Sequence, residues 1–149
     1  EAVLAGSQTE ADLLAWLGGE AGKAALPLVY STADAGVVTA LQAKHGGGKV
    51  AHAIESFFSG LASTLVAKGY RRVITAGGET SSAIVSALGI TAMGIGPEID
   101  PGVPVVVSEG KKNGGAPRLA LALKSGNFGA PDFFAKALAT IDSMPSGGA

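Results

Sequence analysis

The chain has 149 residues, of which 47% are hydrophobic and 15% charged, so it can bury a core and is too apolar to be disordered. The absence of cysteine excludes disulfides and thiolate metal sites, and a net charge of −1 without a run of Lys and Arg argues against nucleic acid as a partner. We find no apolar stretch that approaches the length of a membrane span and no signal peptide, so we expect a cytoplasmic protein without a membrane partner.

The first part of the sequence is predicted to be mainly helical. Thr9 is a candidate N-cap of the first helix, and the apolar run Leu26 to Tyr30 indicates a short strand. A second helix is expected over Asp34 to His45. The clearest helix covers Val50 to Lys68, because apolar residues recur there every three or four positions and Gly69 follows as a C′ residue.

The second part of the sequence alternates short strands with helices. Strands are predicted at Arg72 to Ala76, Thr91 to Ile95, Val103 to Val107 and Leu119 to Lys124, and helices at Ser82 to Leu88 and Pro131 to Ile141. Connectors are expected at Gly96 to Pro104 and, as a mobile loop, at Ser108 to Pro117, with a frayed tail at residues 142–149. The alternation predicts a single α/β domain over residues 1–149, with three layers and a largely parallel sheet flanked by helices.

The strongest candidate site is the glycine loop AGGETSS, which follows the second predicted strand and precedes a helix. In a parallel sheet this position faces the ligand crevice. Gly77 and Gly78 let the backbone approach a ligand closely, and the free N–H groups of Glu79, Thr80 and Ser81 would point at an anion such as phosphate. The simpler alternative is a tight turn in which Thr80 or Ser81 is an N-cap.

A second loop of the same type, KSGNFGAP, follows the strand that ends at Lys124. Gly126 lies within this loop, and the charge of Lys124 can reach a phosphate oxygen. Ser125 and Asn127 are further candidate phosphate contacts. The alternative is that Lys124 is a solvated strand end and that Gly126 and Asn127 form a turn. Two such loops in one sheet suggest a single polyphosphate ligand.

Other polar residues have weaker functional interpretations. Glu79 could bind the Mg²⁺ that accompanies a nucleotide, or it could stabilise the helix N-terminus by its charge. Neither histidine lies at metal-ligand spacing from another ligand type, so both are expected at a helix end or on a helix surface. HGGGK, at His45 to Lys49, lacks the flanking residues of a Walker A loop. Glu98 and Asp100 could line a ligand pocket or be turn residues, and no residue stands out as a catalytic base.

Three segments, AGGETSSAIVSALGI, GPEIDPGVP and LALALKSGNFG, resemble in this order the C-terminal nucleotide-binding domain of the four-carbon acid sugar kinase family. The resemblance runs from roughly Pro27 to Leu138 and is nearest to 3-oxo-tetronate kinases, with threonate and erythronate kinases as relatives. It implies ATP-dependent phosphorylation of a terminal hydroxyl group on a four-carbon sugar acid, with ATP and Mg²⁺ as cofactors. The residues that it implies for ATP contact are Gly77, Gly78, Glu79, Thr80 and Gly126.

The resemblance also implies a partner domain. The family binds its sugar acid on an N-terminal domain, and this chain begins with Glu1 rather than Met, so we expect a C-terminal piece that binds ATP or ADP and lacks the catalytic residues. Ser82 stands where the family often has Gly, Val105 where it often has Trp, and Gly6-Ser7-Gln8 matches an upstream serine motif too poorly to inherit its role. The alternatives are a non-catalytic nucleotide-binding module and a sugar-phosphate-binding module, and a homo-oligomer is left open.

Overall fold

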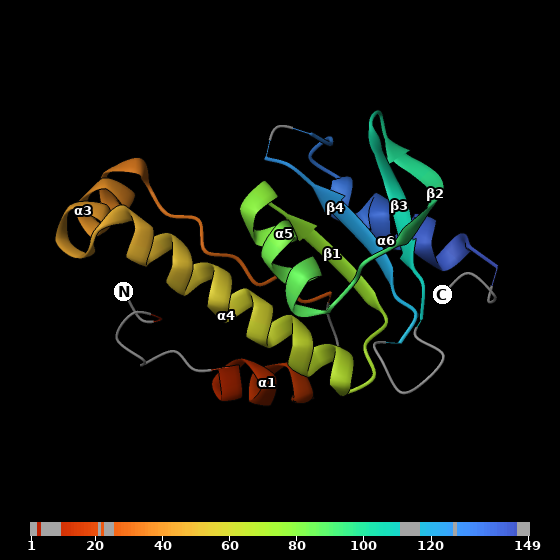
Figure 1. Ribbon diagram of the computed structural model, residues 1–149, viewed down its shortest axis with the longest axis horizontal. Coiled ribbons are helices and arrows are strands. Elements are labelled where there is room, and N and C mark those ends of the chain that lie inside the picture. Colours follow the sequence, from red (N-terminus) through yellow and green to blue (C-terminus); the bar gives the residue numbers. More distant parts are fainter. Residues whose placement is uncertain are drawn as a thin grey trace. The chain divides into compact units, whose positions relative to one another are not determined.

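The computed structural model describes Val3, residues 10–20, Gly22 and residues 26–110, 117–126 and 128–145. The chain divides into two compact units, Glu1–Phe57 and Phe58–Ala149, and both predicted glycine loops lie in the second (Figure 1). Several predicted features lie outside the described residues: the N-cap Thr9, the segment Gly6-Ser7-Gln8, residues 111–116 of the expected mobile loop, the phosphate contact Asn127 and residues 146–149 of the expected tail. The extent of the single domain stays a prediction.

The first unit is helical. It contains α1 (Glu10–Gly18), α3 (Ala35–His45) and the beginning of α4 (Gly47–Ala67), which continues into the second unit. These helices confirm the helical prediction, whereas the strand predicted from Leu26 to Tyr30 is wrong, since these residues form no strand. An apolar run becomes a strand only where a neighbouring strand takes up its backbone hydrogen bonds, and the described part of this unit contains no other strand.

The helix α4 has 21 residues and is, within the described part of the chain, the one helix long and apolar enough to cross a membrane by length and composition. The expectation that no apolar stretch approaches such a length is therefore wrong for this helix. Its later residues Ala62 and Val66, however, are buried in the core of the second unit. The end of α4 therefore contributes one face to this core.

The second unit is built on one four-stranded sheet. Its strands are β1 (Arg72–Ala76), β2 (Met93–Asp100), β3 (Val103–Ser108) and β4 (Ala120–Lys124), in the order β1-β4-β3-β2, and its further helices are α5 (Gly78–Ala87) and α6 (Phe133–Ser143). β1 is parallel to β4, whereas β3 runs antiparallel to both β4 and β2. The predicted α/β class is confirmed, but the prediction of a largely parallel sheet is wrong.

The antiparallel pairing of β2 and β3 follows from a short connection. Pro101 and Gly102 form a two-residue turn between β2 and β3, with Gly102 at a φ of +79°. A connection this short can join only antiparallel strands, whereas parallel strands need a long crossover. The sequence analysis treated Gly96 to Pro104 as a connector, yet β2 extends to Asp100 through Pro97. Proline is tolerated there because β2 is an edge strand.

Helices cover both faces of the sheet, which gives the three predicted layers (Figure 1). On one face the end of α4 and the helix α5 pack against the strands, with Ile84 and Leu121 in the shared buried cluster. On the other face α6 packs through Phe133 and Ala137, which are buried with Ala122. Neighbouring residues of β4 point to opposite faces, as strand geometry requires. The sheet therefore has two buried sides, and its strand ends are left to contact ligands.

Candidate functional site

The two predicted glycine loops meet at the carboxyl ends of two neighbouring strands. β1 and β4 are parallel neighbours, and Ala76 pairs with Lys124 at their carboxyl ends. The backbone N–H of Gly77 donates a hydrogen bond of 2.9 Å to the carbonyl oxygen of Lys124. The structure thus joins two loops that are distant in the sequence, at the edge where α/β sheets bind their ligands.

The first loop turns sharply from β1 into α5. Gly77 has a φ of +107°, a conformation that is open to glycine and strained for other residues. The N–H of Ser81 donates to the carbonyl oxygen of Gly77 over 2.9 Å and begins the hydrogen bonding of the helix. The N–H groups of Gly78, Glu79 and Thr80 therefore have no acceptor within α5. With the positive end of the helix dipole, they form a site suited to an anion.

Ser81 differs from the other predicted contacts of this loop. Its N–H belongs to the helix, its side chain is buried, and its hydroxyl oxygen lies 3.5 Å from Oγ1 of Thr75. The helix was expected to begin near Ser82 but begins at Gly78, so the set of free N–H groups is shifted toward Gly78. A phosphate contact at Ser81 stays a prediction, and its N–H and hydroxyl are already engaged.

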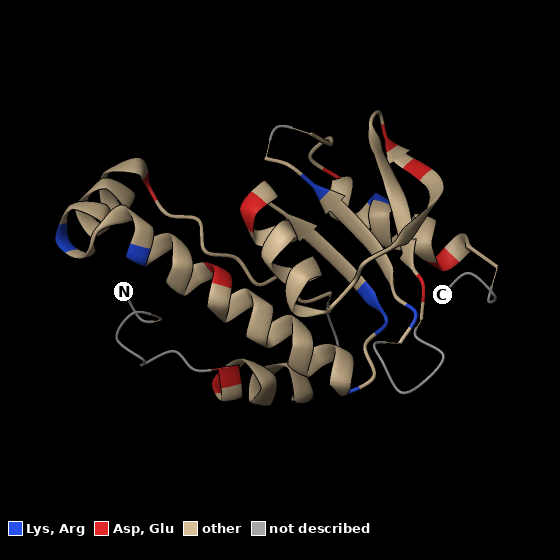
Figure 2. Ribbon diagram, in the orientation of Figure 1, with Lys and Arg blue, Asp and Glu red and all other residues tan. Residues whose placement is uncertain are grey.

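The second loop carries a positive charge. Nζ of Lys124 donates to the carbonyl oxygens of Ser125 at 3.2 Å and Gly126 at 3.1 Å, and it lies 5.8 Å from the ring centroid of Phe133. The N–H of Phe128 donates to the carbonyl oxygen of Ser125 over 3.3 Å. Figure 2 shows the basic end of β4 at the same edge of the sheet as the acidic first turn of α5. The ammonium group therefore lies on the loop itself.

Each of the two loops has a glycine that borders open space. A Cβ atom placed on Gly78 or on Gly126 would meet no atom within 4 Å. At Gly129, by contrast, it would lie 2.7 Å from the ring of Phe133, so the packing of the chain itself requires this glycine. Open space beside free N–H donors and a lysine fits the phosphate groups of a nucleotide.

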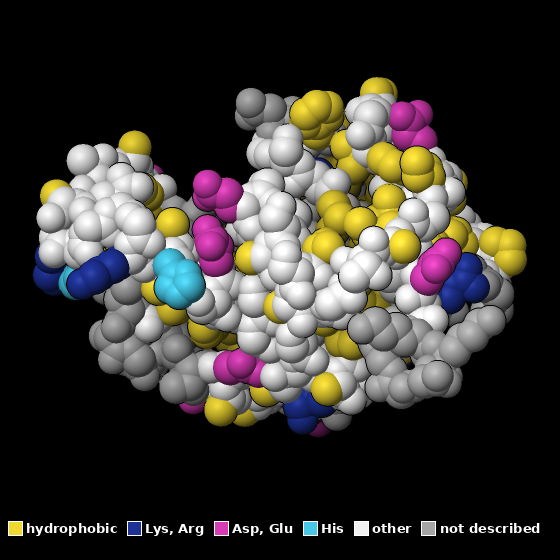
Figure 3. All heavy atoms as spheres, viewed as in Figure 1, with side chains coloured by type: hydrophobic (Ala, Val, Ile, Leu, Met, Phe, Trp, Pro, Cys, Tyr) yellow, Lys and Arg dark blue, Asp and Glu magenta, His cyan; other side chains and the backbone are white. Residues whose placement is uncertain are grey.

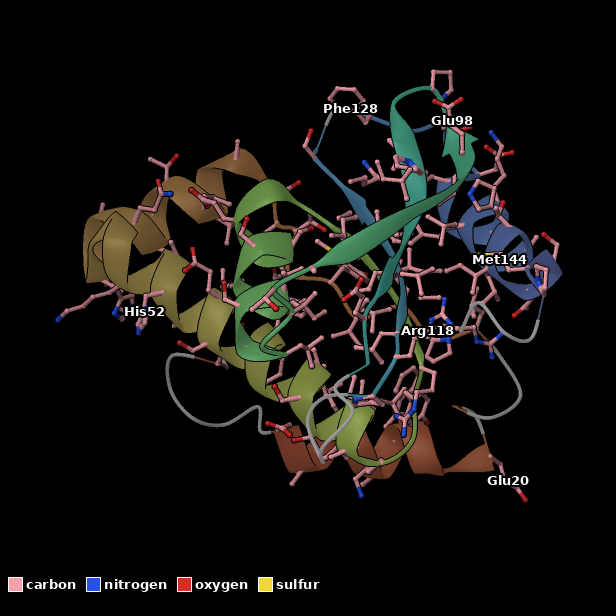
Figure 4. The ribbon with its side chains drawn as sticks, turned by 45° about the vertical axis from the view of Figure 1, so that its right-hand side comes forward. Glu20, His52, Glu98, Arg118, Phe128 and Met144 are labelled. Carbon is pink, nitrogen blue, oxygen red and sulfur yellow. The ribbon has the colours of Figure 1, made fainter. Side chains whose placement is uncertain are left out.

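The candidate metal ligand Glu79 is exposed in the first turn of α5. Within the residues that the structure describes, no group of three or more His, Cys, Asp or Glu residues could hold a metal ion. A Mg²⁺ ion at Glu79 would therefore take its other ligands from phosphate oxygens and water. The role of Glu79 stays a prediction. His45 ends α3 and His52 is exposed on α4, as expected for both histidines (Figure 4).

The hairpin between β2 and β3 carries two carboxylates that sequence analysis left open between pocket and turn. Glu98 accepts a hydrogen bond of 2.8 Å from the N–H of Gly102 and therefore stabilises the turn. Asp100 is buried, and its Oδ2 accepts a hydrogen bond of 2.9 Å from the N–H of Ala130 at the end of the second glycine loop. Sequence analysis missed this link because 30 residues separate the two partners.

Asp100 also forms an ion pair. Its Oδ1 lies 2.7 Å from Nζ of Lys136 on α6, and the same ammonium group lies 3.1 Å from the carboxylate of Asp132. The hydrogen bond from Lys136, followed by the one from the Ala130 amide, holds the pKa of Asp100 below its ordinary value. Hydrogen bonds to Asp100 and then Asp132 raise the pKa of Lys136. Asp100 is therefore ionised at neutral pH.

Comparison with known proteins identifies the family. Residues 1–134 match the model of a family described as nucleotide-binding C-terminal domain. The chain belongs to this family. A 3-oxo-tetronate kinase from Methylobacterium radiotolerans is 48% identical over 137 residues, which cover 91% of this chain and 31% of that protein. Another from Cupriavidus necator is 49% identical over 111 residues, which cover 74% of this chain and 24% of that protein.

A solved structure supports the fold of this nucleotide-binding C-terminal domain. The crystal structure of a Haemophilus influenzae protein matches with a TM-score of 0.72 and 40% identity, covering 87% of this chain and 29% of the other. These findings confirm the resemblance to the C-terminal domain of four-carbon acid sugar kinases. The chain spans between 24% and 31% of the two curated relatives described above, so it corresponds to one part of those proteins.

Proposed function

We propose that the chain is the ATP-binding domain of a kinase that phosphorylates a terminal hydroxyl group of a four-carbon acid sugar of the 3-oxo-tetronate, threonate or erythronate type. The observation that carries the proposal is the hydrogen bond between Gly77 and Lys124, because it joins two glycine loops at the carboxyl ends of parallel strands. Nucleotides bind to α/β sheets at such strand ends. The relatives named 3-oxo-tetronate kinase support the reaction type.

In this proposal the two loops hold the polyphosphate from two sides. The backbone of residues 77–80 donates N–H groups to phosphate oxygens at the start of α5. Gly126 lets the second loop approach the phosphates closely, and Lys124 offsets their negative charge. Bound ATP would supply the phosphoryl group. Glu79 is the candidate ligand for the Mg²⁺ ion that accompanies ATP. Three residues remain further candidates for phosphate contact: Ser81, Ser125 and Asn127.

The acceptor site and the catalytic base are assigned to the part of the kinase that this chain does not cover. The chain matches 31% or less of each relative described above, and in this proposal the sugar acid binds to a separate N-terminal domain. The chain alone then binds ATP or ADP and transfers no phosphoryl group. The same proposal includes a cytoplasmic location without nucleic acid or membrane partners, and it leaves a homo-oligomer open.

Isothermal titration calorimetry of the chain with Mg-ATP and Mg-ADP tests the proposal. We expect saturable binding of one nucleotide per chain, accompanied by a rise in melting temperature, because a ligand that binds only the folded state stabilises it. The absence of both heat and thermal shift at millimolar nucleotide would count against nucleotide binding by this chain.

A matched pair of glycine variants locates the binding site. Gly126→Val should abolish nucleotide binding, because its branched side chain fills the space beside the second loop, and folding should persist since no atom lies within 4 Å of the added Cβ. Gly36→Val adds the same side chain to open space on α3 and should bind nucleotide as the unmodified chain does. Equal binding by both variants would place the nucleotide elsewhere.

Two alternatives make different predictions in the same titration. A sugar-phosphate-binding module would bind a phosphosugar more tightly than ATP. A non-catalytic nucleotide-binding module would bind ATP but would be encoded without a substrate domain. An upstream coding sequence that continues in frame into such a domain would exclude this second alternative.

A further inference from the structure

The second glycine loop is fastened at its end by a carboxylate from another part of the sheet. Asp100 is the last residue of β2, and its side chain retains only 10% of its solvent exposure. Its Oδ2 accepts the N–H of Ala130 at 2.9 Å. The opposite end of the loop is fixed by β4, where Gly77 donates to the carbonyl oxygen of Lys124 at 2.9 Å. The loop therefore has one backbone anchor at each end.

The hairpin that carries Asp100 also reaches the middle of this loop. A Cβ atom placed on Gly102 would lie 3.5 Å from Cε1 of Phe128, so the hairpin turn and the Phe128 ring are near neighbours. Glu98 holds that turn through the N–H of Gly102 at 2.8 Å. Figure 4 shows Glu98 and Phe128 at the same end of the second unit. The hairpin thus supports the loop at its middle and its end.

The anchor is charged and is itself held in place. Oδ1 of Asp100 pairs with Nζ of Lys136 at 2.7 Å, so each oxygen of the carboxylate has its own donor. Lys136 also pairs with Asp132 within the first turns of α6. A hydrogen bond to an ionised acceptor is stronger than one between neutral groups. The Ala130 amide is therefore fixed by a rigid, charge-assisted contact.

We propose that Asp100 is a positioning residue for ATP, which holds Phe128 and Ala130 of the second glycine loop in the arrangement that receives the phosphates. The inference rests on the proposed nucleotide-binding function of this loop. Asp100 touches no phosphate in this account. It accepts a hydrogen bond from the Ala130 N–H, and the hairpin between β2 and β3 holds its carboxylate in place.

Three variants test the role of Asp100 by calorimetry with Mg-ADP. Asp100→Ala removes the acceptor, and we expect it to weaken ADP binding by about tenfold or more. Asp100→Asn keeps an amide oxygen that can accept the Ala130 N–H, so it should bind more tightly than the alanine variant. Asp142→Ala is the control, because it breaks an ion pair between α6 and Arg72 at the far end of β1. It should bind ADP as the unmodified chain does.

The proposal is overturned if folded Asp100→Ala binds ADP as tightly as the unmodified chain, or if Asp142→Ala weakens binding as strongly. Hydrogen exchange at the Ala130 amide gives a second readout that needs no nucleotide. Exchange should be faster in Asp100→Asn than in the unmodified chain, and unchanged exchange would overturn the proposal even if the alanine variant fails to fold. If the unmodified chain binds no ADP, the proposed function fails, and the exchange measurement then decides only whether Asp100 anchors the Ala130 amide.

Discussion

The parallel and antiparallel halves of the sheet have different tasks. The parallel strands β1 and β4 end side by side in two glycine loops that expose N–H groups, a lysine and open space. The antiparallel strands β2 and β3 are joined by a tight hairpin whose carboxylates, Glu98 and Asp100, are already hydrogen-bonded. The difference indicates that ligand contacts belong to the parallel pair, while the hairpin supports the loop beside it.

Burial divides the sheet differently, between its central strands and its edge strands. Leu121 on β4 and Val105 on β3 have no exposed surface, since both strands lie inside the sheet. On the edge strand β2, Ile95 is 83% exposed and Met93 is 40% exposed. Figure 3 shows hydrophobic side chains at the surface over this part of the sheet. The second glycine loop therefore follows a buried central strand, β4, whereas the edge strand β2 is exposed.

The largest effect on stability is expected from Leu121→Ala. This substitution empties a fully buried position in the cluster that β4 shares with α4 and α5, and it should lower the free energy of unfolding by about 2–5 kcal/mol. Ile95→Ala on the exposed edge should change it by less than about 0.5 kcal/mol. Urea unfolding followed by circular dichroism measures both, and equal losses would contradict the proposed division between centre and edge.

A smaller effect is expected from Gly77→Ala, which places a side chain at a φ of +107°. The strain should lower the free energy of unfolding by about 1–3 kcal/mol. Gly78→Ala is the matched control, because its added Cβ meets no atom within 4 Å and alanine is favoured over glycine in a helix. Thermal unfolding of the two variants should give a lower melting temperature only for Gly77→Ala. A loss in both would indicate that the turn depends on more than the conformation of Gly77.

The smallest effect on stability is expected from lowering the pH. The pKa of Asp100 is lowered in the folded chain by Lys136 and by the Ala130 amide, while Asp132 is the other charged group that faces Lys136. Because a lowered pKa stabilises the folded state above the pKa of the unfolded chain, this contribution is lost as pH falls below about 4. The difference in melting temperature between the unmodified chain and Asp100→Asn should therefore shrink between about pH 5 and pH 2. A difference independent of pH would show that the charge of Asp100 contributes nothing.

The sequence predicted the local parts of this structure well and the long-range parts poorly. The glycine loop after β1 was predictable, because Ala76-Gly77-Gly78 follows a β-branched strand and precedes a helix. The direction of β2 and β3 could not be predicted from Pro97 and Pro101. These prolines are typical of a connector, but an edge strand and a hairpin turn both tolerate proline. Periodicity and turn signals depend on residues that are close in the sequence, whereas strand direction depends on which distant segments pair in the sheet.

The candidate site shows the same limit. The residues of both loops could be named from composition and spacing, since glycines, a lysine and a helix start are local signals. The contact between Asp100 and Ala130 could not be predicted, because it depends on how the hairpin folds over the β4 end. The bond between Gly77 and Lys124 likewise required β1 and β4 to be neighbours in the sheet. Sequence therefore predicted the parts of the site, and the fold supplied their arrangement.

The most direct test of the two-loop site is a titration of the ¹⁵N-labelled chain with Mg-ADP, followed through its backbone amide signals. We expect the amides of Gly78, Glu79, Thr80 and Gly126 to shift most, because these groups surround the proposed phosphates. The amide of Ile95, on the exposed edge strand, should stay unchanged. Saturable shifts centred on β2 or on α3, with the four loop amides unmoved, would contradict the account.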